Sequence, residues 1–299
     1  MEARLAWGTI RAAQVADMAA RIADIETGRI IPARPRDAAT VIVLRPAADA
    51  AGTSAPATPA GDGVEVLMLR RPAAMAFAPG AYVYPGGSVD PGDADLRVGW
   101  HGPPAADIGE RLGASRELAR AIVCAAVRET FEEAGILLAG TPDGALAVPD
   151  GPAWDRDRAA LMSGAETLAE VLARRGLVIR ADLLTPWARW ITPEAEPKRF
   201  DARFFAAALP PGQQATGHAT ETERTAWLRP EAAIEAARGG SITLLPPTAT
   251  TLNEFAACGS LPLPEILGQR RVITPVQPRF EVDQGQAWLV IPDEADYPL

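Results

Sequence analysis

Cysteine and histidine are scarce in this chain of 299 residues: Cys124 and Cys258 are the only thiols, and His101 and His218 the only imidazoles. Two thiols cannot build the disulfide framework of a small secreted domain or a thiolate zinc site. We expect Cys124 to be buried packing. Both histidines are expected in loops, and neither is assigned a metal role. The chain is therefore neither a disulfide scaffold nor a zinc-finger-like protein.

Positive charge is also in short supply. Lys198 is the only lysine, and the formal net charge is −9 at pH 7. Nucleic acids and anionic membranes are bound through basic surfaces, so neither is expected as a partner. The sequence also lacks a continuous apolar run suited to a signal peptide or a membrane-spanning helix. We expect a soluble cytoplasmic protein, a monomer or homodimer, whose partner is a small molecule.

Apolar residues are plentiful, at 48% of the chain against 22% charged residues, which is enough to bury a sizeable core. Strands alternate with helices, and some connections are short enough for antiparallel pairs, which predicts an α/β fold with a mixed sheet. Strands are expected at 38–46, 63–71, 81–87, 185–193, 198–209 and 224–228, a terminal hairpin at 280–291, and helices at 10–30, 115–134, 154–176, 230–238 and 246–269.

The most informative helix contains the segment RETFEEAG, with Ser115 as its expected N-cap and Gly135 just past its end. Glu129, Glu132 and Glu133 stand at i, i+3 and i+4, so they share one helical face. Like charges at this spacing destabilise a helix unless they are neutralised. On an exposed helix, solvent and Arg128 suffice. Apolar residues around this helix favour burial, where a divalent cation is the better neutraliser.

A glycine pair, Gly86 and Gly87, follows the predicted strand at 81–87. Only glycine lets a backbone carbonyl turn towards a cation at such a corner. A glycine carbonyl and three carboxylates suit Mg²⁺ or Mn²⁺, with positions left for substrate phosphates and water.

Together the two segments resemble the Nudix box, G-x5-E-x7-R-E-U-x-E-E-x-G-U, where U is aliphatic. Its head is matched by Gly87, with Asp93 at the first Glu position, and its tail by Arg128, Glu129, Glu132, Glu133, Gly135 and Ile136. Asp93 in place of Glu and Thr130 in place of an aliphatic residue are departures. Residues 94–127 occupy the place of x7, and we expect an insertion at about 94–114 to be a surface loop.

The resemblance implies a Nudix fold, a mixed β-sheet sandwiched between helices, over residues 37–240. Residues 1–36 would be a helical extension with a linker, and 241–299 an extension packed on the same domain. It also implies roles: Gly86, through its carbonyl, Glu132 and Glu133 bind Mg²⁺ or Mn²⁺, Glu129 binds metal or activates water, and Arg128 orients the glutamates. A loop glutamate often completes such sites; Glu221 is predicted, with Glu223 as competitor.

The segment at 67–90 further resembles coenzyme A diphosphatases, although Ala78 replaces their histidine. With the insertion and WITPEAEPKRFDARFF, it looks like the Nudix 19 subfamily, which cleaves CoA and acyl-CoA to 3′,5′-ADP and (acyl-)4′-phosphopantetheine. Two alternatives stay open. One is an ADP-ribose or NAD(H) diphosphatase; the other is a non-catalytic Nudix-fold nucleotide-binding module, although such modules typically lose box glutamates.

A CoA substrate requires cations for its 3′-phosphate. The candidates are Arg70, Arg71, Lys198, Arg199 and Arg203. Any one of them taken alone is more typical of a solvated strand end. Aromatic residues on the predicted strands (Trp187, Trp190, Phe204 and Phe205) are able to stack on adenine but are more often core.

Overall fold

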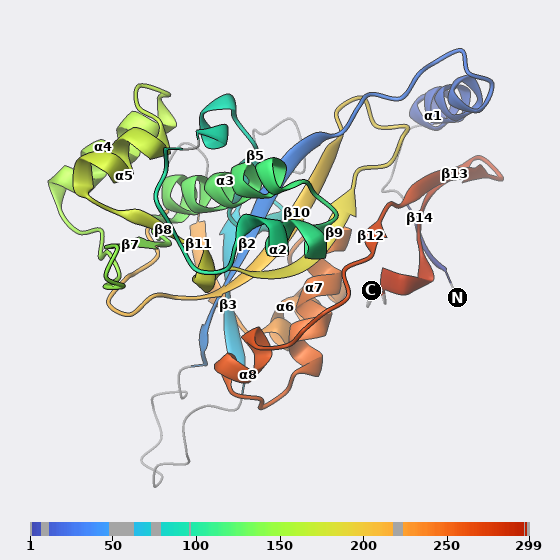
Figure 1. Cartoon of the computed structure of the whole chain (residues 1–299). Helices are drawn as coiled ribbons and strands as arrows, with labels where there is room; N and C mark the ends of the chain where they lie inside the picture. The colour runs from blue at the N-terminus through green and yellow to red at the C-terminus, as the bar shows by residue number, and fades with distance from the viewer. Residues whose placement is uncertain are drawn as a thin grey trace, which may run out of the picture.

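A mixed β-sheet forms the centre of the molecule (Figure 1). The computed structural model describes residues 2–6, 12–47, 63–72, 79–95, 97–217, 224–295 and 297. The sheet runs in the order β11-β3-β2-β10-β9-β12, with β4 on β3 and β5 on β2. Its strands are β2 (Arg36–Pro46), β3 (Val64–Arg70), β4 (Tyr82–Val83), β5 (Gly86–Ser88), β9 (Thr185–Ile191), β10 (Phe200–Ala208), β11 (Arg224–Leu228) and β12 (Pro275–Val276). The pairs β2–β10 and β9–β12 are parallel and the others antiparallel, as a mixed sheet requires.

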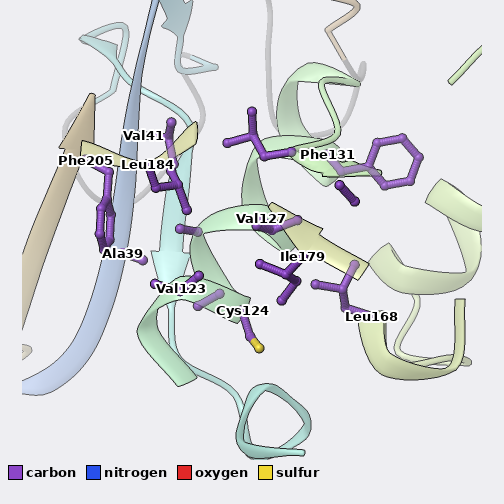
Figure 2. Packing of buried hydrophobic residues seen from close by; sticks show 14 of the residues in the cluster. Ala39, Val41, Val123, Cys124, Val127, Phe131, Leu168, Ile179, Leu184 and Phe205 are labelled. Carbon is purple, nitrogen blue, oxygen red and sulfur yellow. The ribbon is translucent and has the colours of Figure 1, made fainter. Parts of the chain in front are cut away.

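Helices cover both faces of this sheet. α3 (Arg116–Ala134) lies on one face, and α6 (Pro230–Arg238) and α7 (Pro246–Ala257) on the other (Figure 1). Alternation along β2 divides its side chains, with Ala39, Val41 and Val43 towards α3 and Ile42 and Leu44 towards α6 and α7. Figure 2 shows Ala39 and Val41 facing the buried side of α3. The predicted fold class is confirmed.

Both predicted ends of α3 are present. The Ser115 hydroxyl accepts a hydrogen bond from the Leu118 N–H at 3.2 Å, and Gly135 adopts the left-handed conformation with φ 69°. Cys124 and Phe131 are buried, as expected for a helix that packs on the sheet and on neighbouring helices (Figure 2).

The insertion is not a loop, so that prediction is wrong. It follows the 3₁₀ turn η1 (Pro91–Ala94), which carries Asp93, and it contains β6 (Trp100–His101) and the helix α2 (Ala105–Leu112). Ile108 and Leu112 stand at the i, i+4 spacing of one helix face and are buried in the core that includes α3, and α2 also contacts β9. The Arg189 side chain on β9 donates to the Leu112 carbonyl at 3.2 Å. A helix this short, with few apolar residues, would not be stable alone in water; its packing against the rest of the protein stabilises it.

Smaller elements complete this side of the molecule. The segment at 154–176 forms two helices, α4 (Pro152–Met162) and α5 (Leu168–Arg175). A small sheet that the sequence did not predict joins β6, β7 (Ala139–Gly140) and β8 (Val178–Arg180), and η2 (Ala181–Leu183) follows it.

The two ends of the chain meet. β1 (Ala3–Ala6) pairs with β14 (Gln286–Ile291), which forms the predicted hairpin with β13 (Arg279–Asp283). α1 (Ala12–Glu26) packs on this hairpin through Met18, Ile22 and Ile25. α8 (Leu263–Leu267) and η3 (Asp293–Ala295) are the remaining elements. Among the described residues, every helix is too short or too polar to cross a bilayer.

Candidate active site

The corner at Gly86 and Gly87 has no room for side chains. β5 pairs with β2 in a register that sets Gly86 opposite Thr40 and Gly87 opposite Ala39. A Cβ atom on Gly86 would lie 2.4 Å from the Ala39 carbonyl oxygen, and one on Gly87 would lie 2.3 Å from Glu129 Oε1. Glycine at 86 therefore lets the strands approach, while glycine at 87 lets a carboxylate of α3 approach the strand.

The N–H and C=O groups of Gly86 point away from β2. The neighbouring Pro85 carbonyl accepts from the Val41 N–H at 2.9 Å, so in the alternating antiparallel pattern the Gly86 groups face the other way. Consistent with this, the Gly86 N–H donates to Glu133 Oε2 at 3.0 Å. Because a strand residue directs its N–H and C=O to the same side, the Gly86 carbonyl also faces away from β2, as the predicted ligand role requires.

Arg128 joins the two halves of the box. Its Nε and Nη2 donate to the two carboxylate oxygens of Asp93 at 3.0 and 2.9 Å. Its Nη1 donates to Glu129 at 2.9 Å and to Glu132 at 3.3 Å, and Nη2 also reaches the Ser88 carbonyl at 2.9 Å. Asp93 is 2% exposed and Arg128 8%. The fold thus restores contact between residues that the insertion separates in sequence, and the guanidinium fixes two of the predicted metal-binding carboxylates.

The carboxyl of Glu129 has a raised pKa. Burial raises the pKa of its carboxyl to about 7; the Arg128 guanidinium opposes this shift, and the Glu132 carboxylate adds to it. A buried carboxyl that is costly to ionise, next to a second carboxylate, is an environment that a bound cation would stabilise.

The donor set fits a hard cation in chemistry, since it consists of carboxylate and carbonyl oxygens. Within the described ranges, however, the acidic and imidazole or thiol side chains form no group of three or more in metal-ligating geometry. Arg128 holds Glu129 and Glu132, and Gly86 holds Glu133. Glu221 and Glu223 lie outside the described residues. The ligand roles therefore stay predictions.

The C-terminal end of α3 has partners that sequence reasoning missed. Arg158 on α4 donates from Nε to the Glu132 carbonyl at 2.9 Å, and its two terminal nitrogens donate to Thr216. Gln213 bonds both the N–H and the carbonyl of Leu137 at 2.9 Å. Neither residue belongs to a recognisable motif, so only the folded chain reveals these contacts.

Two candidate substrate-binding cations lie at the end of β3. The Arg71 N–H donates to the Ala81 carbonyl at 2.9 Å, which extends the ladder one residue past Arg70. Leu69 faces α3, so alternation places Arg71 on the α3 face of the sheet and Arg70 on the opposite face.

The other candidates lie on or beside β10. Lys198 is exposed in the β9–β10 turn, with its ammonium 5.2 Å from the centre of the Phe200 ring. Arg199 is 6% exposed and donates to the Thr192 and Ala33 carbonyls, and Arg203 is 2% exposed and paired with Asp37 and Asp201.

The structure does not support substrate binding by Arg199 and Arg203. A cation that is buried and already paired cannot reach a phosphate without breaking those contacts. The aromatic candidates are core, as expected: Trp187 stacks on Phe255 with ring centres 4.4 Å apart.

Comparison with known proteins agrees with this geometry. The model of the NUDT19 Nudix domain matches residues 104–254. The human acyl-coenzyme A diphosphatase NUDT19 is 29% identical over 276 residues, covering 77% of this chain and 71% of that protein, and the Gallus gallus protein of the same name is 29% identical over 253 residues, covering 71% and 65%. The crystal structure of a Nudix hydrolase from Alicyclobacillus acidocaldarius superposes with a TM-score of 0.62 at 27% identity, covering 80% of this chain and 98% of that one. The chain therefore belongs to the Nudix hydrolases of the NUDT19 type, enzymes that act on diphosphates.

Proposed function

We propose that this protein hydrolyses the diphosphate of CoA or acyl-CoA, in a reaction that depends on Mg²⁺ or Mn²⁺, to give 3′,5′-ADP and (acyl-)4′-phosphopantetheine. The observation that carries the proposal is the similarity to two acyl-coenzyme A diphosphatases along most of the chain. The presence of Glu129, Glu132 and Glu133, held by Arg128 and the Gly86 N–H, supports catalysis over binding alone, because non-catalytic modules of this fold typically lose box glutamates.

In this proposal Glu132, Glu133 and the Gly86 carbonyl would hold the cation, and Glu221, or its competitor Glu223, would be a further ligand. Bound divalent metal lowers the pKa of a coordinated water and neutralises charge on bridging phosphates. Arg128 keeps Glu129 and Glu132 in place through charge-assisted hydrogen bonds, with Asp93 buried behind it.

Glu129 is proposed either to bind the metal or to accept a proton from the attacking water. Its carboxylate lies over Gly87, at the junction of α3 with β5, and its pKa of about 7 suits a group that accepts a proton near neutral pH. In the proposed reaction an oxygen of Glu129 takes the proton from the attacking water, or the same oxygen binds metal.

Substrate recognition falls to the cations that the fold leaves near the surface. Arg71 is the first choice for the 3′-phosphate because it lies on the α3 face at the end of β3, next to the strand that leads to the glycine corner. Lys198 is a more distant candidate, in the β9–β10 turn.

A mass-spectrometric screen tests the proposal. CoA, acetyl-CoA, NADH, ADP-ribose and 8-oxo-dGTP are incubated with protein and Mg²⁺ or Mn²⁺, with Glu132→Gln as the matched inactive control. We expect 3′,5′-ADP from CoA and acetyl-CoA. Preferential cleavage of NADH or ADP-ribose would replace the CoA proposal with the nucleotide-diphosphatase alternative, and tight binding of a nucleotide without turnover would favour a binding module.

A further inference from the structure

One arginine ties the end of α3 to a distant part of the chain. Arg158 is 8% exposed on α4, and its Nε donates to the Glu132 carbonyl at 2.9 Å. Its Nη1 and Nη2 donate to the hydroxyl and the carbonyl of Thr216 at 3.1 and 2.8 Å. A single planar guanidinium therefore spans the last turn of α3 and the loop after β10 that contains Thr216.

These contacts satisfy helix-end groups that would otherwise lack partners. The last four carbonyls of a helix have no partner within it, and those of Glu132 and Ala134 fall in that group. Arg158 donates to the Glu132 carbonyl, and the Thr216 N–H donates to the Ala134 carbonyl at 2.8 Å. A Cβ atom on Gly135 would lie 2.2 Å from the Thr216 hydroxyl. The last turn of α3 and the chain at Thr216 are thus in tight contact, and the cation complements the helix dipole.

The helix that carries Arg158 is itself held firmly against α3. Trp154 packs edge-on against Phe131, with ring centres 5.9 Å apart, and the Arg175 guanidinium lies 3.5 Å from the centre of the Trp154 ring. Leu161 is buried in the same core. Arg158 therefore reaches the end of α3 from a fixed support.

Its location gives this bridge a functional consequence. The turn whose backbone Arg158 holds carries Glu132 and Glu133, and the chain at Thr216 leads towards Glu221 and Glu223, which lie outside the described residues. We propose that Arg158 is a positioning residue: by bridging the Glu132 carbonyl and Thr216, it sets the last turn of α3, with its carboxylates, against the segment at Thr216. The inference rests on the proposed metal-dependent hydrolysis.

The alternative is a helix cap that serves stability alone. A cap needs one donor and a positive charge, which lysine supplies, whereas the bridge needs the fork of a guanidinium. Arg158→Lys therefore separates the two roles. Thr216→Val is the complementary change, because it removes only the hydroxyl end of the bridge.

The experiment measures kcat, KM and Mn²⁺ affinity, the last by isothermal titration without substrate. Loss of a group that orients metal ligands typically costs about 10- to 100-fold in metal affinity or activity. We expect Arg158→Lys to lower kcat roughly tenfold and weaken Mn²⁺ binding about as much, with KM nearly unchanged. Thr216→Val should change both in the same direction by a smaller factor.

Arg111→Lys is the matched control, since Arg111 on α2 also donates to a backbone carbonyl, that of Pro186 at 3.2 Å. It should leave Mn²⁺ affinity unchanged. Wild-type Mn²⁺ affinity and kcat in folded Arg158→Lys would overturn the proposal, as would a wild-type protein that binds no Mn²⁺. If Arg158→Lys does not fold, Thr216→Val decides by the same criteria. If the wild type binds Mn²⁺ but cleaves no diphosphate, the proposed function fails, and the Mn²⁺ comparison still decides the role of Arg158.

Discussion

Alanine at Gly87 should separate activity from stability. A Cβ atom there would lie 2.3 Å from Glu129 Oε1 and 2.5 Å from its Cδ, whereas ordinary contacts begin near 3.4 Å. The carboxylate must retreat by the difference, 3.4 − 2.3, or about 1 Å. A displacement of that size in a catalytic group costs roughly 100-fold in rate. Because the displaced atoms are the end of a flexible side chain, the backbone of β5 need not move, and the free energy of unfolding should change by less than about 1 kcal/mol.

Gly86→Ala is the matched comparison. Its Cβ atom would lie 2.4 Å from the Ala39 carbonyl oxygen and 2.7 Å from the Thr40 Cα, both backbone atoms of β2. The strands must separate, which costs about 1–3 kcal/mol and lowers Tm by roughly 2–4 °C for each kcal/mol. Steady-state kinetics with the substrate found in the screen, together with thermal unfolding, measures both effects. Wild-type kcat in Gly87→Ala would refute the placement of Glu129, and a large fall in its Tm would show that the strand rather than the carboxylate moves.

Four further outcomes are expected. Glu132→Gln should lower kcat by orders of magnitude at saturating Mg²⁺ with Tm preserved, because one negative charge is lost next to the cation; unchanged turnover would remove Glu132 from the site. Asp93→Ala should lower the unfolding free energy in urea by about 3 kcal/mol, since it leaves Arg128 buried with a lost partner, and a change below about 1 kcal/mol would contradict this. Ile108→Ala in α2 should cost about 2–5 kcal/mol, whereas a neutral result would restore the loop interpretation of the insertion. CoA should exceed dephospho-CoA in kcat/KM by roughly ten- to a hundred-fold, a preference that Arg71→Ala should reduce; equal values in the wild type would argue against a 3′-phosphate contact.

Local pattern was enough to determine much of this protein. The long strands β2, β3, β9 and β10 and the helix α3 with its Ser115 and Gly135 caps all follow from hydrophobic spacing and capping chemistry within a few residues. The Nudix box could be identified despite its interruption because each half has its own signature. The glycine pair marks the strand corner, and the acidic face marks the helix.

Tertiary structure alone decided which charged residues are accessible and which distant groups meet. In the sequence, Arg199 and Arg203 look like candidates for binding a phosphate. The fold buries both, in contacts with residues more than 160 positions away along the chain. The helix α2 forms because Ile108 and Leu112 are buried in the core that includes α3, and Arg158 contacts the Glu132 carbonyl because α4 packs where α3 ends. Secondary structure depends on neighbours in the chain, whereas burial, ion pairing and the capping of a helix by another element depend on contacts that no local pattern encodes.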